Sequence, residues 1–570
     1  MFVLTILSAW VLGSVVVAII SRRGARLSVG QWAITAFVIG ILVAGFFTDV
    51  KYTAFFGAMQ RNDGVFSYLA LATLSIAAMM SFEPANMKQI RTGLLVIALV
   101  LTGYGFLQTY GRDPVKWVRL YGPVIGTLGN PDFLSGLLGV ASVATLWVIF
   151  AKEKIWLRWT GVILLLLELF IIRRSASIQG FFAFGAGLIL LTIVKLWHLN
   201  KRAGITSFFF AGIALILGLL GLLNKGPLAA VIYHRTIRNR IDYWHAAINM
   251  FKAHPFVGIG LDRFGENYGQ YAPQIQVSQG TTTDNAHNVF LQLLATGGLV
   301  VIIPYLFLLG VILWTAMRGI KNSVGDAQIH IVALFAIWIA LLLISCISID
   351  NLGVAVWFWI SGGALYGVAH KSLRKDEQKP IGKSKAVKSA KRTTQSSLSY
   401  IAPIASLIIT IVVLIAMVPA WRGSSMLNEL QRNKSRLTQP QFAAKLKEIA
   451  NIQPNNVQTL LVLSNTALNT PWVDLALSYA KKANEKDLRS YFGNYLSAIA
   501  YEGTKKSDQA IPYRIRLTEL DPWNTPNMLQ LVKDYVQVKD LVKAQVIAAR
   551  ISQLQPNGGD AQAAAALIKG

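Results

Sequence analysis

A histidine carries the strongest chemical signal in the sequence. His287 stands in the segment 284–294 (DNAHNVFLQLL), which begins with polar residues and continues as an apolar run. An imidazole with an ordinary pKa near 6.5 can accept or donate a proton at neutral pH. We predict a helix capped by Asp284 or Asn285, with His287 in its first turn and Asn288 on its polar stripe. The alternative reading of a lone histidine here is a structural role.

Arg240 and Trp244 lie four residues apart, on one stripe of a predicted helix. A guanidinium there can hold a phosphate through two hydrogen bonds, and the aromatic ring can stack on a sugar or an isoprenoid. The segment 254–260 (HPFVGIG) follows. Its proline breaks the helix and its two glycines allow a tight backbone turn. The pattern therefore indicates an anion site near a sharp turn.

A metal site is not expected. Four of the seven histidines fall within residues 224–296, but 11, 9 and 33 positions separate them, unlike the close pairs of zinc sites. The single cysteine, Cys346, excludes an internal disulfide and a cysteine-based metal site. We predict neither a metal nor a cofactor.

The elements that must position these side chains are membrane helices. Hydrophobic residues make up 54% of the 570 residues, and charged residues only 14%. Soluble domains carry about 25% charged residues, so a soluble multidomain enzyme is excluded. A helix needs about 20 apolar residues to cross a bilayer. Such runs predict an all-α membrane bundle with about twelve spans, near residues 2–20, 30–47, 64–82, 92–108, 133–151, 157–172, 178–197, 205–223, 297–317, 328–347, 352–369 and 401–421.

The net charge of +27 indicates topology rather than nucleic acid binding. Lys and Arg recur after every second span, and nine of them fall in residues 370–392. The positive-inside rule places this side, including a basic linker at 370–400, in the cytoplasm. Both termini and the long loop 224–296 are then predicted to lie outside the cytoplasmic membrane.

Three clusters of cations break this rule on the outward side. Cations at positions where the rule disfavours them predict anion binding, with snorkelling to lipid headgroups as the alternative. The clusters are Arg112, Lys116 and Arg119; Arg173 and Arg174; and Arg235, Arg238 and Arg240.

Residues 425–570, which follow the transmembrane domain predicted at 1–421, have no run long enough to span a membrane. Pro454, Pro522 and Pro556 fit a spacing of 34 residues. A period of 34 with two amphipathic helices per unit resembles tetratricopeptide repeats, whose arrays bind peptides or partner proteins on a concave face. The alternative is a helical stack without a ligand. The predicted units are 454–487, 488–521 and 522–555.

Together the motifs resemble the O-antigen ligase family, over roughly residues 90–370. The resemblance rests on RxxxW from Arg240, on HPFVGIG, and on DNAHNVFLQLL with the glycines that follow it. Upstream, the segment 126–133 (GTLGNPDF) is similar to that family's GxxxNPN segment. The segment 177–180 (SIQG) lies where members have SRG, with Ile178 in place of the arginine.

The resemblance implies a metal-independent membrane glycosyltransferase of the GT-C type. Such an enzyme takes a glycan from an undecaprenyl-diphosphate carrier at the outer face of the cytoplasmic membrane and passes it to an acceptor, which is a lipid, a polymer or a protein. On this reading His287 acts as a base or orients the diphosphate, and Arg240 is the second catalytic candidate. The predicted substrate-binding residues are Arg119, Arg173, Arg174, Trp244, Asn288, Asp284 and Asn130.

Three other functions remain open. One is a protein O-oligosaccharyltransferase of the same fold, which a protein-binding tail favours. Another is a polysaccharide or lipid transporter, although no matched pair of interrupted helices marks two halves of the chain. The third is a non-catalytic scaffold, for which twelve spans are more than anchoring needs.

Overall fold

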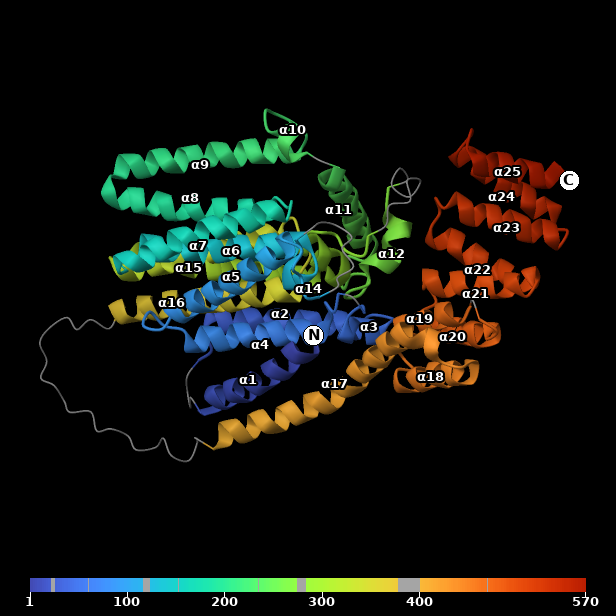
Figure 1. Ribbon diagram of the computed structural model, residues 1–570, viewed down its shortest axis with the longest axis horizontal. Helices are drawn as coiled ribbons and strands as arrows, with labels where there is room; N and C mark the ends of the chain where they lie inside the picture. Colours follow the sequence, from blue (N-terminus) through green and yellow to red (C-terminus); the bar gives the residue numbers. More distant parts are fainter. Residues whose placement is uncertain are drawn as a thin grey trace, which may run out of the picture.

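The computed structural model describes residues 1–21, 26–59, 61–115, 124–151, 153–233, 235–273, 283–377, 400–468 and 470–569. Within these ranges the regular elements are all helices, as the sequence predicts. Figure 1 shows two groups of them: a bundle of long, roughly parallel helices, and an array of short helices beyond one end of the bundle.

Eleven of the described helices are long and apolar enough to cross a membrane, so the chain is a multi-pass membrane protein. Their backbone polar groups are satisfied within each helix, which is what a hydrocarbon environment requires. They are α1 (Phe2–Ser21), α2 (Val29–Phe46), α5 (Lys88–Thr109), α6 (Pro131–Phe150), α7 (Ile155–Arg174), α8 (Gln179–Leu199), α9 (Lys201–Leu222), α14 (Val289–Asn322), α15 (Asp326–Ser345), α16 (Leu352–Glu377) and α17 (Ile401–Asn433).

The twelfth expected span, at 64–82, is a shorter helix. It is α4 (Val65–Ser81), whose 17 residues are one fewer than the 18 of α2, the shortest of the eleven. It packs between α16, α1 and α2 inside the bundle. Among the described residues, eleven helices of 18 residues or more are thus candidate spans, and α4 is a shorter apolar helix packed among them.

Aromatic side chains hold the centre of the bundle together. The ring of Phe37 in α2 lies 5.7 Å from that of Tyr305 in α14 and 5.2 Å from that of Trp359 in α16, centroid to centroid. All three side chains are buried. At the periphery, α9 exposes Phe208, Phe209 and other apolar side chains along nearly its whole length. Such an exposed apolar surface suits contact with lipid.

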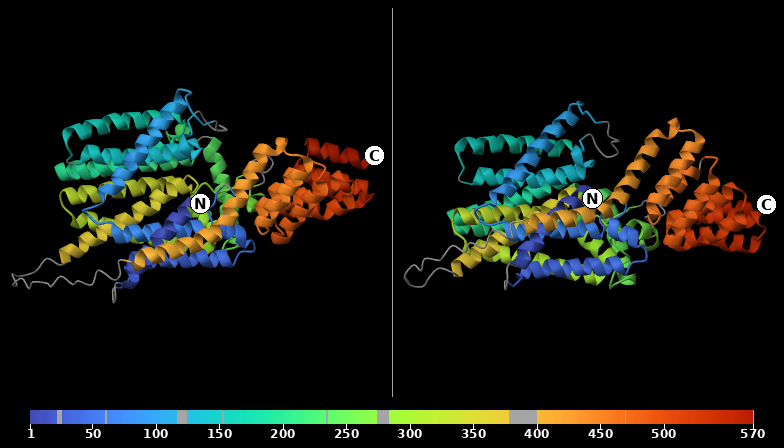
Figure 2. Two further views of the ribbon diagram at one scale, coloured as in Figure 1. Left: turned by 60° about the horizontal axis from the view of Figure 1, so that its bottom comes forward. Right: turned by 90° about the horizontal axis from the view of Figure 1, so that it is seen from below.

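Among the described residues, four short helices and the longer α11 lie together at one end of the bundle, and the sequence motifs lie on them or next to them. They are α3 (Lys51–Phe56), η1 (Gly126–Leu128), α10 (Ala229–Ile232), α11 (Arg235–Ala253) and α12 (Phe264–Tyr271). The N-terminus lies at this end, whereas α16 ends and α17 begins at the opposite end (Figures 1 and 2). This arrangement agrees with the relative topology expected from the charges, while the assignment of the outer face stays a prediction.

The C-terminal helices recur at a constant offset. After η2 (Lys434–Arg436) and α18 (Gln439–Ile452), helices begin at 457, 491, 525 and 559, each 34 residues after the last. Their partners begin at 473, 507 and 541, again 34 apart. These helices are α19 (Val457–Leu468), α20 (Val473–Lys486), α21 (Tyr491–Gly503), α22 (Ser507–Leu520), α23 (Thr525–Gln537), α24 (Leu541–Leu554) and α25 (Gly559–Lys569). The repeat array is defined here as α19 to α25, and its assignment to the tetratricopeptide class stays a prediction.

A buried ion pair joins the repeat array to the end of the bundle. The Nη2 of Arg263, just before α12, lies 2.7 Å from Oδ2 of Asp487, just after α20. The side chains are only 3% and 2% exposed, so breaking the pair would leave an uncompensated buried charge. Arg489 also donates to the side chain of Gln270, and Gln458 accepts a hydrogen bond from the backbone of Met59.

Candidate functional site

A tight turn holds His287 in front of α14. The Oδ1 of Asn285 accepts a hydrogen bond from the backbone N–H of His287 at 2.9 Å, which forms an Asx turn. The Oε1 of Gln292 accepts one from the N–H of Ala286 at 3.0 Å, so the first turns of the helix fix the loop. His287 has a φ of +52°, in the left-handed region that residues other than glycine rarely adopt. The turn thus fixes the imidazole at a conformational cost.

The helix begins later than the sequence predicts. Its N-cap is Asn288, whose Oδ1 accepts from the N–H of Leu291 at 3.0 Å, and not Asp284 or Asn285. The Nδ2 of Asn288 also donates to the carbonyl of Cys346 at 2.9 Å, which ties the turn to the end of α15. Because the Asx turn comes before the helical dihedrals begin, the imidazole lies ahead of the first helical turn rather than within it.

The imidazole of His287 is arranged to accept a proton. Its Nδ1 lies 3.1 Å from the carbonyl oxygen of Asn285. A carbonyl oxygen only accepts, so in the neutral ring Nδ1 carries the hydrogen and Nε2 keeps the lone pair. Burial lowers the pKa of His287 below its ordinary value, and the charges of Arg240 and Arg61 lower it further against the opposing effect of the Asn285 hydrogen bond. The ring is therefore uncharged near neutral pH.

Arg240 joins three segments that are distant in sequence. It lies on α11, is largely buried, and places Nη2 3.5 Å from Oδ2 of Asp132 at the start of α6. The Oδ1 of Asp132 accepts a hydrogen bond from Ser177, in the turn between α7 and α8, at 2.6 Å. Burial lowers the pKa of Arg240, but an arginine stays charged at neutral pH. A separation of 3.5 Å is longer than a strong charge-assisted hydrogen bond, so a second anion can compete for the guanidinium.

Arg61 is a site residue that we did not select from the sequence. Its Nε and Nη2 donate to the two carboxylate oxygens of Asp284 at 2.8 and 2.7 Å. The side chains are 24% and 46% exposed, so water partly screens the pair. A phosphate, which binds a guanidinium through the same paired geometry, can compete with the carboxylate. Arg61 falls between the second and third predicted spans, on the outward side, so the rule that selected Arg173 and Arg174 also applies to it.

Backbone pairing joins the two halves of the sequence pattern. Gly298 has a φ of +62° and a ψ of −162°, which interrupts α14. Residues 255–260 lie against this break, and the N–H of Ile259 donates to the carbonyl of Ala295 at 3.0 Å. A Cβ built on Gly298 would lie 2.4 Å from the carbonyl oxygen of Phe256. The missing side chain at Gly298 therefore lets the two backbones approach closely.

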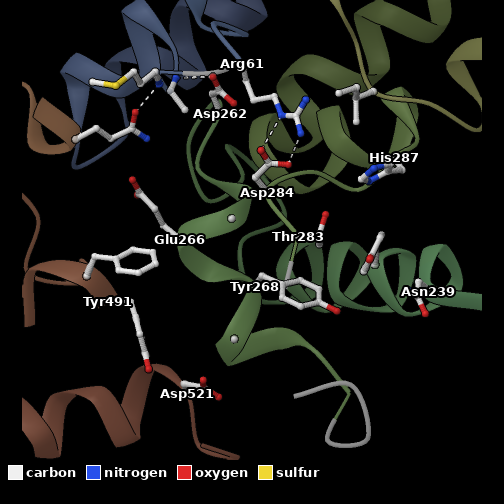
Figure 3. Close-up of a pocket in the computed structure, with 18 of the residues that line it drawn as sticks. Arg61, Asn239, Asp262, Glu266, Tyr268, Thr283, Asp284, His287, Tyr491 and Asp521 are labelled. Atoms are coloured by element: carbon white, nitrogen blue, oxygen red, sulfur yellow. Dashed lines mark hydrogen bonds and ion pairs between the residues drawn. The ribbon is translucent and has the colours of Figure 1, made fainter. Parts of the chain in front are cut away.

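One large cleft, with a volume of about 1630 Å³, lies between the bundle end and the repeat array. Ligand sites for small molecules typically measure about 300–1,000 Å³, so this cleft has room for more than one ligand. Figure 3 shows Asp284 and His287 on the bundle side and Tyr491 and Asp521 on the side of the repeat array. Arg240 also lines it.

Burial weakens the negative charge of the carboxyl groups that line this cleft. Burial raises the pKa of Asp262 to about 7, although backbone hydrogen bonds from Ala58 and Asp63 oppose the shift. Burial also raises the pKa of Glu266, against the lowering effect of Arg263. With a pKa of about 7, Asp262 is partly protonated near neutral pH, while the guanidinium groups are fully charged. The cleft therefore repels an anionic ligand less than its carboxyl count implies.

The predicted cation cluster reaches the cleft only in part. Arg119 lies outside the described residues. Arg173 and Arg174 end α7 with exposed side chains, and neither is among the described residues that line the cleft. Their role in substrate binding stays a prediction that this geometry does not favour.

The remaining predicted ligands have identifiable contacts. Asn130 lines the cleft, where its Oδ1 caps α6 by accepting from the N–H of Asp132 at 2.8 Å. Trp244 is not among the described lining residues, but its neighbour Tyr243 is. The ring centroid of Tyr243 lies 5.4 Å from that of His287. The aromatic ring beside His287 is thus Tyr243, and the role of Trp244 in substrate binding stays a prediction.

Residues 163–306 match the O-antigen ligase family model. The match spans Arg240, the HPFVGIG segment and the His287 turn, and is narrower than the 90–370 expected from the motifs. It does not extend to the segment 126–133 or to the repeat array. No curated protein matches the chain. This match, with the polytopic helical architecture, fits a membrane ligase or polymerase or another glycosyltransferase-type enzyme.

Within the described ranges, no group of three or more His, Cys, Asp or Glu side chains is placed to hold a metal ion. The metal-free mechanism nevertheless stays a prediction.

Proposed function

We propose that the protein is a membrane glycosyltransferase. It transfers a glycan from an undecaprenyl-diphosphate carrier to an acceptor hydroxyl at the outer face of the cytoplasmic membrane. The observation that carries the proposal is the convergence of His287, Arg240 and Arg61 on one cleft at the end of a membrane bundle. The apolar tail of the carrier can remain in the lipid beside the bundle while its diphosphate enters the cleft.

The proposed reaction is a displacement at the anomeric carbon of the carrier-bound sugar. The acceptor oxygen forms the new bond to this carbon, and its proton passes to Nε2 of His287. The bond from the anomeric carbon to the phosphate oxygen breaks, and its electron pair leaves with the lipid diphosphate. Arg240 and Arg61 offset the charge that develops on this leaving group. Proton transfer of this kind contributes about 10²–10⁴ in rate.

A protein acceptor is the second candidate, which would make the enzyme a protein O-oligosaccharyltransferase. The observation in its favour is that the repeat array lines the same cleft as His287. A transporter has less support, because the cleft lies at one end of the bundle and its charged groups meet at a single point.

The test is a transfer assay with the purified full-length protein in lipid nanodiscs. The donor is undecaprenyl-diphosphate glycan, the acceptors are a lipid, a polymer and a protein, and mass spectrometry identifies the product. We expect His287→Ala and Arg240→Ala each to lower transfer at least 100-fold, and excess EDTA to leave the wild-type rate unchanged.

The matched control is His245→Ala, which removes an exposed histidine on α11 that is not among the described lining residues. Its transfer rate should equal that of the wild type. Wild-type activity in His287→Ala would contradict the proposed base, and activity lost in EDTA but restored by a divalent ion would contradict the metal-free reaction.

A further inference from the structure

Three aromatic side chains from α21 face the cleft on its repeat-array side: Tyr491, Phe492 and Tyr495. The rings of Tyr491 and Phe492 lie 5.7 Å apart and nearly perpendicular, while those of Tyr491 and Tyr495 lie 6.5 Å apart and nearly parallel. Phe492 is 63% exposed, so most of its ring is open to the cleft. Together the three rings form an aromatic platform on the cleft wall.

Amide and carboxyl groups surround the aromatic platform. Asn524 donates from Nδ2 to the hydroxyl of Tyr491 at 2.9 Å and to Oδ2 of Asp521 at 3.1 Å. Asp521 is 91% buried, and its Oδ1 has no hydrogen-bond partner among the described residues. Across the cleft, the buried hydroxyl of Tyr268 also lacks one. Polar atoms left unpaired in this way cost free energy. The amide of Asn524 and the hydroxyl of Tyr491, which also line the cleft, can exchange hydrogen bonds with hydroxyl groups of a ligand.

Positive charge is missing from this wall. None of the described residues that the repeat array contributes to the cleft is a lysine or an arginine, and its polar members include the amides of Gln458, Asn465 and Gln555. The two guanidinium groups of the cleft, Arg61 and Arg240, come from the bundle side. An acidic peptide or a polyanion would meet no lysine or arginine among the described residues of this wall, so the wall disfavours an anionic ligand.

An uncharged saccharide matches both features of the wall. The C–H face of a sugar ring is apolar and packs on an aromatic face, while its hydroxyl groups donate to and accept from amides and carboxylates. We infer that the aromatic platform and the side chains around it form a subsite for an uncharged oligosaccharide, which runs along the repeat array away from His287. Its role in catalysis rests on the proposed function, but the binding itself does not.

The chain at this subsite belongs either to the glycan on the donor or to a glycan acceptor. Both present the same chemistry, and kinetics separate them. If Phe492→Ala raises KM for the lipid-linked donor alone, the subsite holds the donor glycan. If it raises KM for the acceptor alone, the subsite holds the acceptor.

Binding is measured by saturation-transfer NMR on the full-length protein in nanodiscs. The probes are uncharged hexasaccharides of glucose, mannose, galactose and N-acetylglucosamine, with hexagalacturonate and a Ser/Thr-rich decapeptide as comparators. We expect at least one uncharged hexasaccharide to bind, Phe492→Ala to weaken it about tenfold, and Phe492→Tyr to retain it. Val546→Ala, which removes a similarly exposed apolar side chain from α24 outside the cleft lining, is the matched control and should bind as the wild type does.

Absence of binding by all four uncharged hexasaccharides at millimolar concentration would overturn the inference, as would equal affinity in Phe492→Ala. Binding of the decapeptide alone, lost in Phe492→Ala, would identify a peptide groove instead and overturn it too. The variant His287→Ala should lose transfer but keep saccharide binding. Transfer at the wild-type rate in His287→Ala with saccharide binding intact would defeat the proposed function and leave the subsite standing.

Discussion

Short-range hydrogen bonds fix the imidazole of His287, whereas the charges that tune it come from distant segments. Asn285 and Gln292, both within five residues, hold the turn. Arg61 and Arg240 approach from the loop before α4 and from α11, and both lower the pKa of the histidine. The environment of the imidazole is therefore complete only when the bundle is assembled.

The rate of transfer should fall in acid. Burial holds the pKa of His287 below 6.5, so the neutral base is present at and above pH 6.5 and is lost as the pH falls through the lowered pKa. We expect kcat/KM to be level between about pH 6.5 and 8 and to decline below that range. Circular dichroism at each pH serves as the control for unfolding. A decline that begins above pH 7 would contradict an uncharged histidine base.

Removing Arg61 should change both rate and pH profile. Arg61→Ala takes away a charge that lowers the pKa of His287 and leaves Asp284 unpaired beside it. We therefore expect the acid limb of kcat/KM to move to higher pH, together with a loss of about 10-fold or more in kcat. Arg61→Lys should retain part of the activity. An unchanged acid limb in Arg61→Ala would show that the cation does not act on the imidazole.

At the scale of elements, the break in α14 decides where the site residues meet. Gly298 leaves the helical conformation and lets residues 255–260 pair with the helix backbone. The same helix carries the His287 turn at its start. One interrupted membrane helix thus positions both halves of the sequence pattern.

Gly298→Ala should destabilise the protein. The new Cβ would lie 2.4 Å from a backbone oxygen of Phe256, and the positive φ adds strain. We expect a loss of about 1–3 kcal/mol, seen as a lower Tm in detergent, and reduced transfer. The control is Gly310→Ala in the same helix, where a Cβ meets open space. Equal Tm values for the two variants would contradict the close packing at the break.

At the scale of the whole molecule, the repeat array closes the site. The cleft is lined from both sides, and the ion pair between Arg263 and Asp487 holds its walls together. The bundle supplies the cations and the imidazole, and the repeat array supplies aromatic and amide groups. On the proposed function, this arrangement separates donor activation from the recognition of a second ligand.

Breaking the Arg263 ion pair should release the repeat array. Arg263→Ala leaves Asp487 and Glu266 without their buried partner, which typically costs about 3–5 kcal/mol. We expect faster hydrogen exchange in α12 and α20 and a larger loss of transfer than of donor hydrolysis. Arg516→Ala, which breaks an exposed pair on α22, is the control and should change neither. Equal loss of both activities in Arg263→Ala would count against the array as a recognition element.

The sequence by itself determined which segments form helices and the spacing at which the C-terminal helices recur. A run of about 20 apolar residues in lipid can satisfy its backbone only as a helix, so α1, α6 and α14 follow directly from composition. The 34-residue offset of the C-terminal helices is likewise present in the proline spacing. His287 and Arg240 were selected by their motifs, and Arg240 also by its place on the outward side, where the charge rule disfavours cations; both line the cleft.

Only the tertiary structure decided which polar groups share a site. It brought Arg61 to Asp284 and Asp132 to Arg240, it left Arg173 exposed, and it placed the repeat array opposite His287. The N-cap also moved from the predicted residues to Asn288, because a side-chain turn competed with the helix. The physical reason is that hydropathy acts locally along the chain, whereas contacts between polar side chains depend on how separate helices pack, and no spacing in the sequence records that packing.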